Sequence, residues 1–238
     1  MLSISYPNSA ITIVFDAVGT LIFARPTVAE VYLSAAIPCG WSGTLADVQN
    51  RFRSSFSSMS GRDLDFTTSE PLQRVRWRAL VGKVFSELSA VQVDAIFERL
   101  WAHFAQPASW DIFPDALSAI ELCNLRGVPW CIGSNFDARL HHVVAGHSQL
   151  SRCQRVFCSS EVGFDKPGAE FFGAIEKSLG LTSNQLIMVG DDASLDAAAA
   201  EQAGWIGLWL NRNSQNSAVD FDGPPQLRSL EELEMWLV

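Results

Sequence analysis

The chain has 238 residues, of which 48% are hydrophobic and 18% charged, and its formal net charge is −9. This composition is typical of a globular protein, and the length suits one large domain or a core with an inserted module. The acidic balance disfavours nucleic acid as a partner, because a negative surface repels phosphates.

The five cysteines are scattered and form no C-x-x-C pair, so neither a zinc site nor a disulfide framework is indicated. No uncharged apolar stretch approaches the roughly 20 residues that a membrane span requires. The first apolar run also lacks the basic segment that opens a signal peptide. We therefore expect a cytoplasmic protein with no membrane partner.

The first expected element is a short strand over residues 11–15. This β-branched apolar run ends in Asp16, and Gly19 and Thr20 follow shortly after. Such a run is typical of a buried parallel strand that leads into a tight turn.

A helical pattern follows between Pro26 and about Pro107. A capping box at Ser89-Ala-Val-Gln92 precedes apolar residues at helical spacing. Thr44-x-x-Asp47 and Ser69-Glu70-Pro71 begin two further helices, and the polar residues 54–69 are expected to form a loop.

Strands and helices alternate after this segment. We expect strands over residues 128–132, 155–158, 186–189 and 205–210. We expect helices over residues 115–126, 137–145, 168–179 and 194–203, and a last short helix capped by Ser229. Repeated β-α units with apolar strands predict a parallel sheet covered on both faces. The expected fold class is α/β, with a Rossmann-like core over residues 1–24 and 108–238 and an inserted all-helical cap over residues 25–107.

Polar side chains follow four of the expected strands. In an open parallel sheet, ligands bind beyond the carboxyl ends of the strands. Each polar group alone is a common turn or cap, but their order along one sheet predicts a single site. The residues concerned are Asp16 after the first strand, Ser134 and Asn135 after the second, Lys166 in the loop after the third, and Asp191, Asp192 and Asp196 after the fourth.

These residues resemble the four motifs of the haloacid dehalogenase superfamily. The segment 16–20 is similar to its first motif, and Ser134 stands where the second motif has Ser or Thr. Lys166-Pro167 resembles the third motif, and the segment 190–196 resembles the fourth. The helical insert lies where this superfamily carries its C1-type cap. Residues 134–140 and 161–167 are also similar to the subgroup called haloacid dehalogenase-like hydrolase domain-containing protein three.

The resemblance implies a magnesium-dependent hydrolase in which Asp16 attacks phosphorus and forms an aspartyl-phosphate. The implied Mg²⁺ ligands are Asp16, the backbone carbonyl of Val18, and Asp191, with Asp192 nearby. Carboxylates and a carbonyl are the oxygen donors that this ion prefers.

The other motif residues would act on the substrate or on its neighbours. Ser134 and Asn135 would bind the phosphoryl group, and Lys166 would add positive charge beside the nucleophile and the phosphate. Asp196 would orient Lys166 or a water bound to the metal.

One position departs from the pattern of the phosphatases in this superfamily. They usually carry a second aspartate two residues after the nucleophile, which protonates the leaving group, whereas this chain has Val18. General acid catalysis typically contributes about 10²–10⁴-fold. The implied substrate is therefore a small phosphorylated metabolite with a good leaving group.

Two other functions remain open. In a 2-haloacid dehalogenase Asp16 would attack carbon, and such enzymes also lack the second aspartate and follow the Ser with Asn. However, Asp191 stands where they tend to carry a neutral hydroxyl residue, and its charge would repel a haloacid. Alternatively, the loss of the acid at Val18 indicates a catalytically weak or vestigial protein that binds or regulates.

The sequence does not name the substrate beyond a small anionic molecule, and we expect a monomer or a weak homodimer. We expect Trp77 to pack within the cap rather than to stack on a substrate. We expect core or surface roles for the histidines at 103, 141, 142 and 147. Six arginines of the insert could each recognise an anion or solvate a helix face: Arg25, Arg51, Arg53, Arg74, Arg76 and Arg78.

Overall fold

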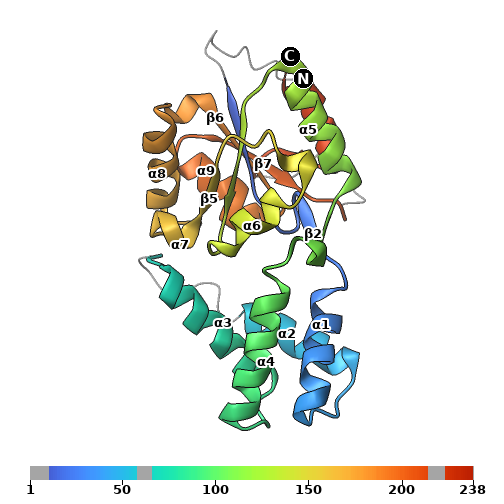
Figure 1. Ribbon diagram of the computed structural model, residues 1–238. Helices are drawn as coiled ribbons and strands as arrows, with labels where there is room; N and C mark the ends of the chain where they lie inside the picture. The colour runs from blue at the N-terminus through green and yellow to red at the C-terminus, as the bar shows by residue number, and fades with distance from the viewer. Residues whose placement is uncertain (1–10, 58–65, 214–222, 238) are drawn as a thin grey trace.

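The computed structural model describes residues 11–57, 66–213 and 223–237. Its centre is a sheet of six strands in the order β5-β4-β1-β6-β7-β8, and every pairing is parallel (Figure 1). The strands are β1 (Thr12–Phe15), β4 (Trp130–Ser134), β5 (Val156–Cys158), β6 (Leu186–Gly190), β7 (Ile206–Leu210) and β8 (Gln226–Leu227). The expected α/β class with a parallel sheet is confirmed.

Helices cover both faces of this sheet, because successive strand residues point to opposite sides. Ile13 and Phe15 of β1 belong to the hydrophobic cluster that includes α5 (Pro114–Arg126) and α6 (Arg139–Ala145). Val14 belongs to the cluster that includes α8 (Ala169–Leu179) and α9 (Ala199–Gln202). The near-continuous apolar strands are therefore buried on both sides, as the sequence predicts.

The inserted segment forms four helices with a hydrophobic cluster of their own. They are α1 (Val28–Ala36), α2 (Leu45–Ser57), α3 (Glu70–Val84) and α4 (Ala90–His103). Figure 1 shows them gathered at one end of the molecule, away from the helices that flank the sheet. The expected caps are present, since the side chains of Ser69 and Ser89 accept hydrogen bonds from the first turns of α3 and α4.

A small antiparallel sheet marks where the chain leaves the core and returns to it. Strand β2 (Ile22–Ala24) pairs with β3 (Trp110–Ile112), with Ile22 opposite Ile112. These short strands escape sequence analysis because neither run is long enough to show a period. The proposed boundaries of the cap, at residues 25 and 107, fall beside this ribbon and stay a prediction.

Several boundaries differ from those expected from the sequence. The strand expected over residues 128–132 is shifted to Trp130–Ser134, so Ser134 is its last residue. The helix expected over residues 194–203 begins as a π-helix (Ala193–Ala198), and the final helix (Leu230–Trp236) is a 3₁₀-helix. Helix α2 continues to Ser57, so residues 54–57 are helical, and residues 58–65 of the expected loop lie outside the described residues. None of the described helices is long and apolar enough to cross a membrane.

Short helices complete the core. Helix α7 (Ser159–Val162) follows β5 directly and precedes the loop that carries Lys166. Several hydrogen bonds join this part of the core to the cap. Arg76 of α3 pairs with Asp165 at 2.7 Å, and Gln73 donates to the same carboxylate at 3.0 Å. The amide of Ala138 donates to Glu70 at 2.8 Å. These contacts hold the cap helices over the carboxyl edge of the sheet.

Candidate active site

The predicted site residues meet at the carboxyl edge of the sheet. Asp16 and Asp191 follow the adjacent strands β1 and β6, and Ser134 ends β4 on the other side of β1. Asp16, Asp191 and Asp196 each place a carboxylate oxygen within 4.8 Å of the others. Parallel strands end at one edge, so residues far apart in the sequence become neighbours here.

The ammonium group of Lys166 bonds to two of these three aspartates. Its Nζ atom donates to Asp16 Oδ1 at 2.8 Å, to Asp196 Oδ1 at 2.5 Å and to the Gly133 carbonyl at 3.1 Å. Only 3% of its side chain is exposed. Burial opposes the charge, but the carboxylates of Asp16 and Asp196 hold the pKa of Lys166 above its usual value. Lys166 is therefore a fixed positive charge beside Asp16.

Asp16 keeps one carboxylate oxygen available to a ligand. Oδ1 accepts from Lys166, whereas Oδ2 has no hydrogen-bond partner among the described residues. The Ser134 hydroxyl lines the same cavity and also lacks a partner within the described part of the chain. An unpaired acceptor and an unpaired donor thus face the same space.

Thr20 and Gly19 fix the position of Asp191. The Thr20 hydroxyl accepts from the Asp191 amide at 3.0 Å. Gly19 has φ +92°, and a Cβ atom there would lie 2.3 Å from Asp191 Oδ2. Any other side chain would strain the backbone and displace the carboxylate. Burial and the neighbouring carboxylates of Asp16 and Asp196 raise the pKa of Asp191 to about 7.

Asp192 and Asp196 have different structural surroundings. The exposed Asp192 caps the π-helix by accepting from the amides of Ser194 and Leu195 at 2.8 and 2.9 Å. Asp196 is buried, and its two oxygens bind Lys166 and the Asp192 amide. Burial raises the pKa of Asp196, and Lys166 opposes that rise. Gly190 makes room, since a Cβ atom there would lie 2.1 Å from Asp196 Cγ.

The side-chain amide of Asn135 bonds to both the N–H and the carbonyl of the Lys166 backbone. Nδ2 donates to the Lys166 carbonyl at 2.8 Å, and Oδ1 accepts from the Lys166 amide at 2.7 Å. This pair of bonds holds the lysine loop against β4. Direct contact between Asn135 and a phosphate stays a prediction.

Arg212 is a member of this region that sequence analysis missed. It follows β7, which ends at the same edge, and donates to the carbonyls of Gly19 and Thr20 at 2.5 and 2.8 Å. It also makes a two-pronged pair with Asp115, with distances of 2.9 and 2.8 Å. Its position just after a strand is a signal that could have identified it. Arg212 fixes the turn that follows Asp16.

A cavity of about 400 Å³ lies between this edge and the cap. Asp16, Val18, Ser134, Lys166 and Asp191 line its floor, and side chains of the cap helices and of neighbouring core segments line the rest. Val18 is 37% exposed and presents an apolar surface beside Asp16. The floor therefore has no proton donor at the position after Asp16 where phosphatases of the resembled type carry one.

None of the six arginines named above lines this cavity. Most of them are engaged in ion pairs: Arg25 with Asp111, Arg51 with Glu87, Arg74 with Glu98, Arg76 with Asp165 and Arg78 with Asp94. Arg53 is exposed. By contrast, Trp77 packs against Phe56 within the cap, as expected, and also lines the cavity.

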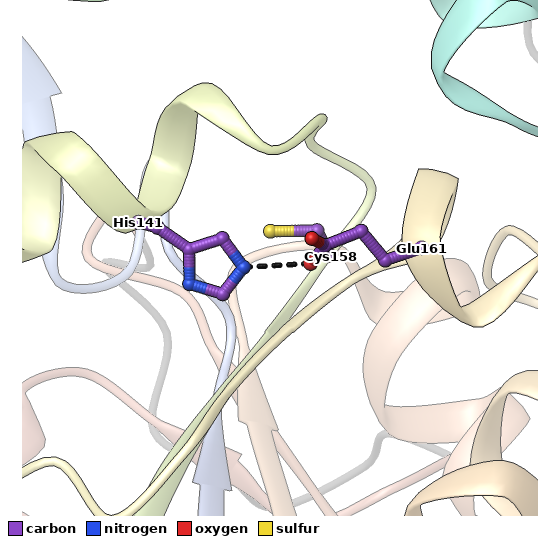
Figure 2. Close-up of side chains that lie close together, drawn as sticks. All are labelled: His141, Cys158 and Glu161. Atoms are coloured by element: carbon purple, nitrogen blue, oxygen red, sulfur yellow. Dashed lines mark hydrogen bonds and ion pairs between the residues drawn. The ribbon is translucent and has the colours of Figure 1, made fainter.

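A second group of metal-ligating residue types lies outside the cavity. Figure 2 shows His141 of α6 pointing toward Glu161 of α7, with the Cys158 side chain beside them. His141 Nε2 lies 2.6 Å from Glu161 Oε2. Burial and the adjacent Glu161 and Asp137 carboxylates raise the pKa of the Cys158 thiol, which disfavours the thiolate that binds metals. We interpret the group as a surface pair packed over a buried thiol, which is one of the two roles, core or surface, expected for the histidines.

A family model for haloacid dehalogenase-like hydrolases matches residues 12–204. The chain is 26% identical over 227 residues to "Haloacid dehalogenase-like hydrolase domain-containing protein 3" of Danio rerio, covering 93% of each chain. It is 25% identical over 137 residues to the phosphoserine phosphatase of Thermus thermophilus, covering 57% of this chain and 54% of that one.

Solved structures show the same fold. The magnesium-bound HAD-hydrolase YfnB of Bacillus subtilis superposes with a TM-score of 0.71 at 17% identity, covering 96% of this chain and 98% of that one. The HAD phosphatase of Thermococcus onnurineus gives 0.67 at 20% identity, with 96% and 98% covered. The L-2-haloacid dehalogenase of Xanthobacter autotrophicus gives 0.66 at 17% identity, with 94% and 97% covered. With the motif residues gathered at one sheet edge beneath a helical cap, and a family model that spans most of the chain, the protein belongs to the haloacid dehalogenase-like hydrolases.

Proposed function

We propose that this hydrolase is a magnesium-dependent phosphatase that uses Asp16 as its nucleophile and acts on a small phosphorylated metabolite with a good leaving group. The supporting observation is the charge balance of the site. The carboxylates of Asp16, Asp191 and Asp196 lie within 4.8 Å of one another. A single ammonium group, that of Lys166, pairs with two of them, Asp16 and Asp196. Such a site favours a bound cation over a bound haloacid anion.

The donor set fits magnesium. Asp16 and Asp191 would be carboxylate ligands and Val18 would offer its backbone carbonyl, all hard oxygen donors. Asp196 would not bind the metal directly, because both of its carboxylate oxygens already accept hydrogen bonds. Asp192 would not bind it directly either, because its carboxylate caps the π-helix. A magnesium ion there would supply positive charge to offset the repulsion between the nucleophile and a phosphate dianion.

The residues of the chain then have distinct parts. The free oxygen of Asp16 attacks phosphorus, and the bond to the leaving oxygen breaks with its electron pair. Ser134 donates a hydrogen bond to a phosphoryl oxygen, and the positive charge of Lys166 offsets the negative charge of the phosphoryl group. Water then attacks phosphorus of the aspartyl-phosphate, the bond to Asp16 breaks with its electron pair returning to the carboxylate, and phosphate leaves with the oxygen and both protons of the water. Asp196 keeps Lys166 in place throughout.

Val18 is the observation that favours a different function. Without a donor at this position, the site suits halide departure, which needs no proton, or a protein with weak activity. A direct test compares p-nitrophenyl phosphate with a 2-haloacid, each with and without Mg²⁺, on wild type and on Asp16→Asn. Phosphate release that needs both Mg²⁺ and Asp16 supports the phosphatase. Halide release without Mg²⁺ supports the dehalogenase, and no turnover of either supports the vestigial protein.

A small substrate suits a cavity of about 400 Å³, at the lower end of ligand pockets. The cytoplasmic location and the monomeric or weakly dimeric state remain part of this proposal.

A further inference from the structure

Aromatic rings from three cap helices form a continuous wall above the aspartates. Tyr32 of α1 contacts Phe52 of α2 with ring centroids 5.2 Å apart, Phe52 contacts Phe56 at 5.6 Å, and Phe56 contacts Trp77 of α3 at 6.1 Å. All four side chains line the cavity. We call these four residues the aromatic wall.

Further rings outside the aromatic wall also line the cavity. Trp101 of α4 and Phe136, which follows β4, both contribute to the lining. The Arg139 guanidinium lies 3.5 Å from the centroid of the Trp101 ring and 5.5 Å from that of Phe136. The space above the nucleophile is thus bordered by ring faces and edges, which favour a planar apolar ligand.

The charged groups of the cavity do not offer a second anion site. Arg139 lines the cavity, but Nε and Nη2 donate to the buried Asp137 at 2.7 Å each, and Nη1 donates to the Trp101 carbonyl at 3.1 Å. Lys166 is bound to Asp16 and Asp196 on the floor. The exposed Asp192 would repel an anion. A substrate with a carboxylate or a second phosphate remote from the reacting group therefore finds no partner among these residues.

Tyr32 provides a polar point within the wall. Its side chain is buried and has no hydrogen-bond partner among the described residues. Burial raises the pKa of the phenol, so the group keeps its proton and can donate one hydrogen bond. The wall thus tolerates one neutral acceptor on an otherwise apolar ligand.

We propose that the aromatic wall binds the organic group of the substrate and selects aryl monophosphates, whose organic group is a flat, uncharged ring system. This inference rests on the proposed phosphatase function and agrees with the missing acid. When Asp16 attacks, the bond between phosphorus and the aryl oxygen breaks, and the electron pair leaves on a phenolate. The ring stabilises that charge, so the phenolate departs without an acid and takes its proton from water afterwards. Aryl monophosphates therefore need no proton donor at position 18 and also fit a cavity lined by the aromatic wall.

The test measures binding of phosphonates, whose carbon–phosphorus bond the enzyme does not hydrolyse. Calorimetry with Mg²⁺ would compare phenylphosphonate, methylphosphonate and inorganic phosphate. A single methylene in an apolar pocket changes recognition by about 10–200-fold, so the phenyl compound should bind at least about tenfold more tightly than the methyl compound. Equal affinity of the two phosphonates would overturn the inference while leaving the phosphatase function intact.

Variants locate the effect. Trp77→Ala should remove most of the preference for phenylphosphonate and leave the affinity for inorganic phosphate unchanged. Trp41→Ala is the matched control, because Trp41 is also a cap tryptophan but packs against Phe85 and does not line the cavity. Should Trp77→Ala not fold, Phe56→Ala carries the same test, since Phe56 is 44% exposed. A preference that survives both substitutions would contradict the role of the wall.

Binding of 2-naphthol, which has no phosphorus, separates the two proposals. Fluorescence titration should show that naphthol binds wild type and binds Trp77→Ala at least about tenfold more weakly. If naphthol binds in this way but no phosphonate does, the phosphatase function fails and the aryl phosphate fails with it. If phosphonates bind but naphthol does not, the aromatic selectivity is wrong and the phosphatase function stands.

Discussion

Arg212 donates through Nη1 to the carbonyl of Gly19 at 2.5 Å, although 193 positions separate the two residues. The same guanidinium binds Thr20 and Asp115 and lies 3.8 Å from the centroid of the Phe113 ring. Gly19 and Thr20 follow Val18, whose carbonyl is a proposed magnesium ligand. Arg212 therefore holds the turn after Asp16 from the end of β7, two strands away from β1 in the sheet.

Arg212→Lys tests this relationship. Lysine keeps the charge but cannot bind two carbonyls and a carboxylate through one planar group. We expect the free energy of unfolding to fall by about 1–3 kcal/mol, as for hydrogen bonds to a charged group. We also expect weaker Mg²⁺ binding, measured by calorimetry, because the Val18 carbonyl is less well fixed. Unchanged Mg²⁺ affinity in a destabilised variant would reduce Arg212 to a structural role.

Asp16→Asn tests the nucleophile. The amide cannot attack phosphorus, yet its volume is nearly that of the carboxylate. We expect turnover of p-nitrophenyl phosphate to fall by about 10⁶-fold, the loss seen when the nucleophile of a hydrolase is removed. Circular dichroism and a melting curve check that the fold is retained. Activity close to wild type would rule out the covalent mechanism.

Asp191→Asn tests the metal site. Removing a charged ligand should weaken Mg²⁺ binding, and we expect a loss of at least about 10–100-fold, the cost typical of changing even an outer-shell partner. Asp192→Ser is the matched control, since it removes the adjacent carboxylate but keeps a residue able to cap the π-helix. Calorimetry on both variants gives the comparison. If both variants lost the same Mg²⁺ affinity, the metal would bind elsewhere or the loss would reflect only the change in net charge.

Lys166→Met tests whether the buried lysine supports the fold as well as the reaction. The change leaves Asp16 and Asp196 without their cation, and breaking a buried pair in this way typically costs about 3–5 kcal/mol. We expect both turnover and the melting temperature to fall. Adding Asp196→Asn should recover part of the stability, because one unpaired charge is removed, but none of the turnover. A stable Lys166→Met protein would show that the site is better hydrated than its burial indicates.

Val18→Asp tests the missing acid. Substrates of the wild type should sort by the leaving group, with p-nitrophenyl phosphate ahead of alkyl phosphates by roughly 10²–10⁴-fold. The variant should narrow that gap by gaining activity on alkyl phosphates. Because Val18 is 37% exposed and lines the cavity, an aspartate there can be hydrated and should not unfold the protein. A stable variant with no gain on alkyl phosphates would count against the missing-acid account and favour the vestigial or dehalogenase function.

The amino-acid sequence by itself determined the α/β class, the helical insert and the convergence of the motif residues. Those features follow from local rules, because apolar runs of strand length form buried strands and the carboxyl ends of parallel strands share one edge. The tight turn at Gly19 and the capping box at Ser89 could also be predicted from the sequence, since each depends on residues a few positions apart.

Only the tertiary structure decided which side chains meet across long separations. The bond from Arg212 to Gly19, the bonds from Asn135 to the Lys166 backbone and the chain of rings from Tyr32 to Trp77 join elements whose relative placement no local pattern encodes. The spacing of Trp77 fits helix packing equally well with or without a cavity beside it. Its place in the wall follows from how the cap helices pack over the sheet edge, and that packing depends on the whole set of buried contacts rather than on any one segment.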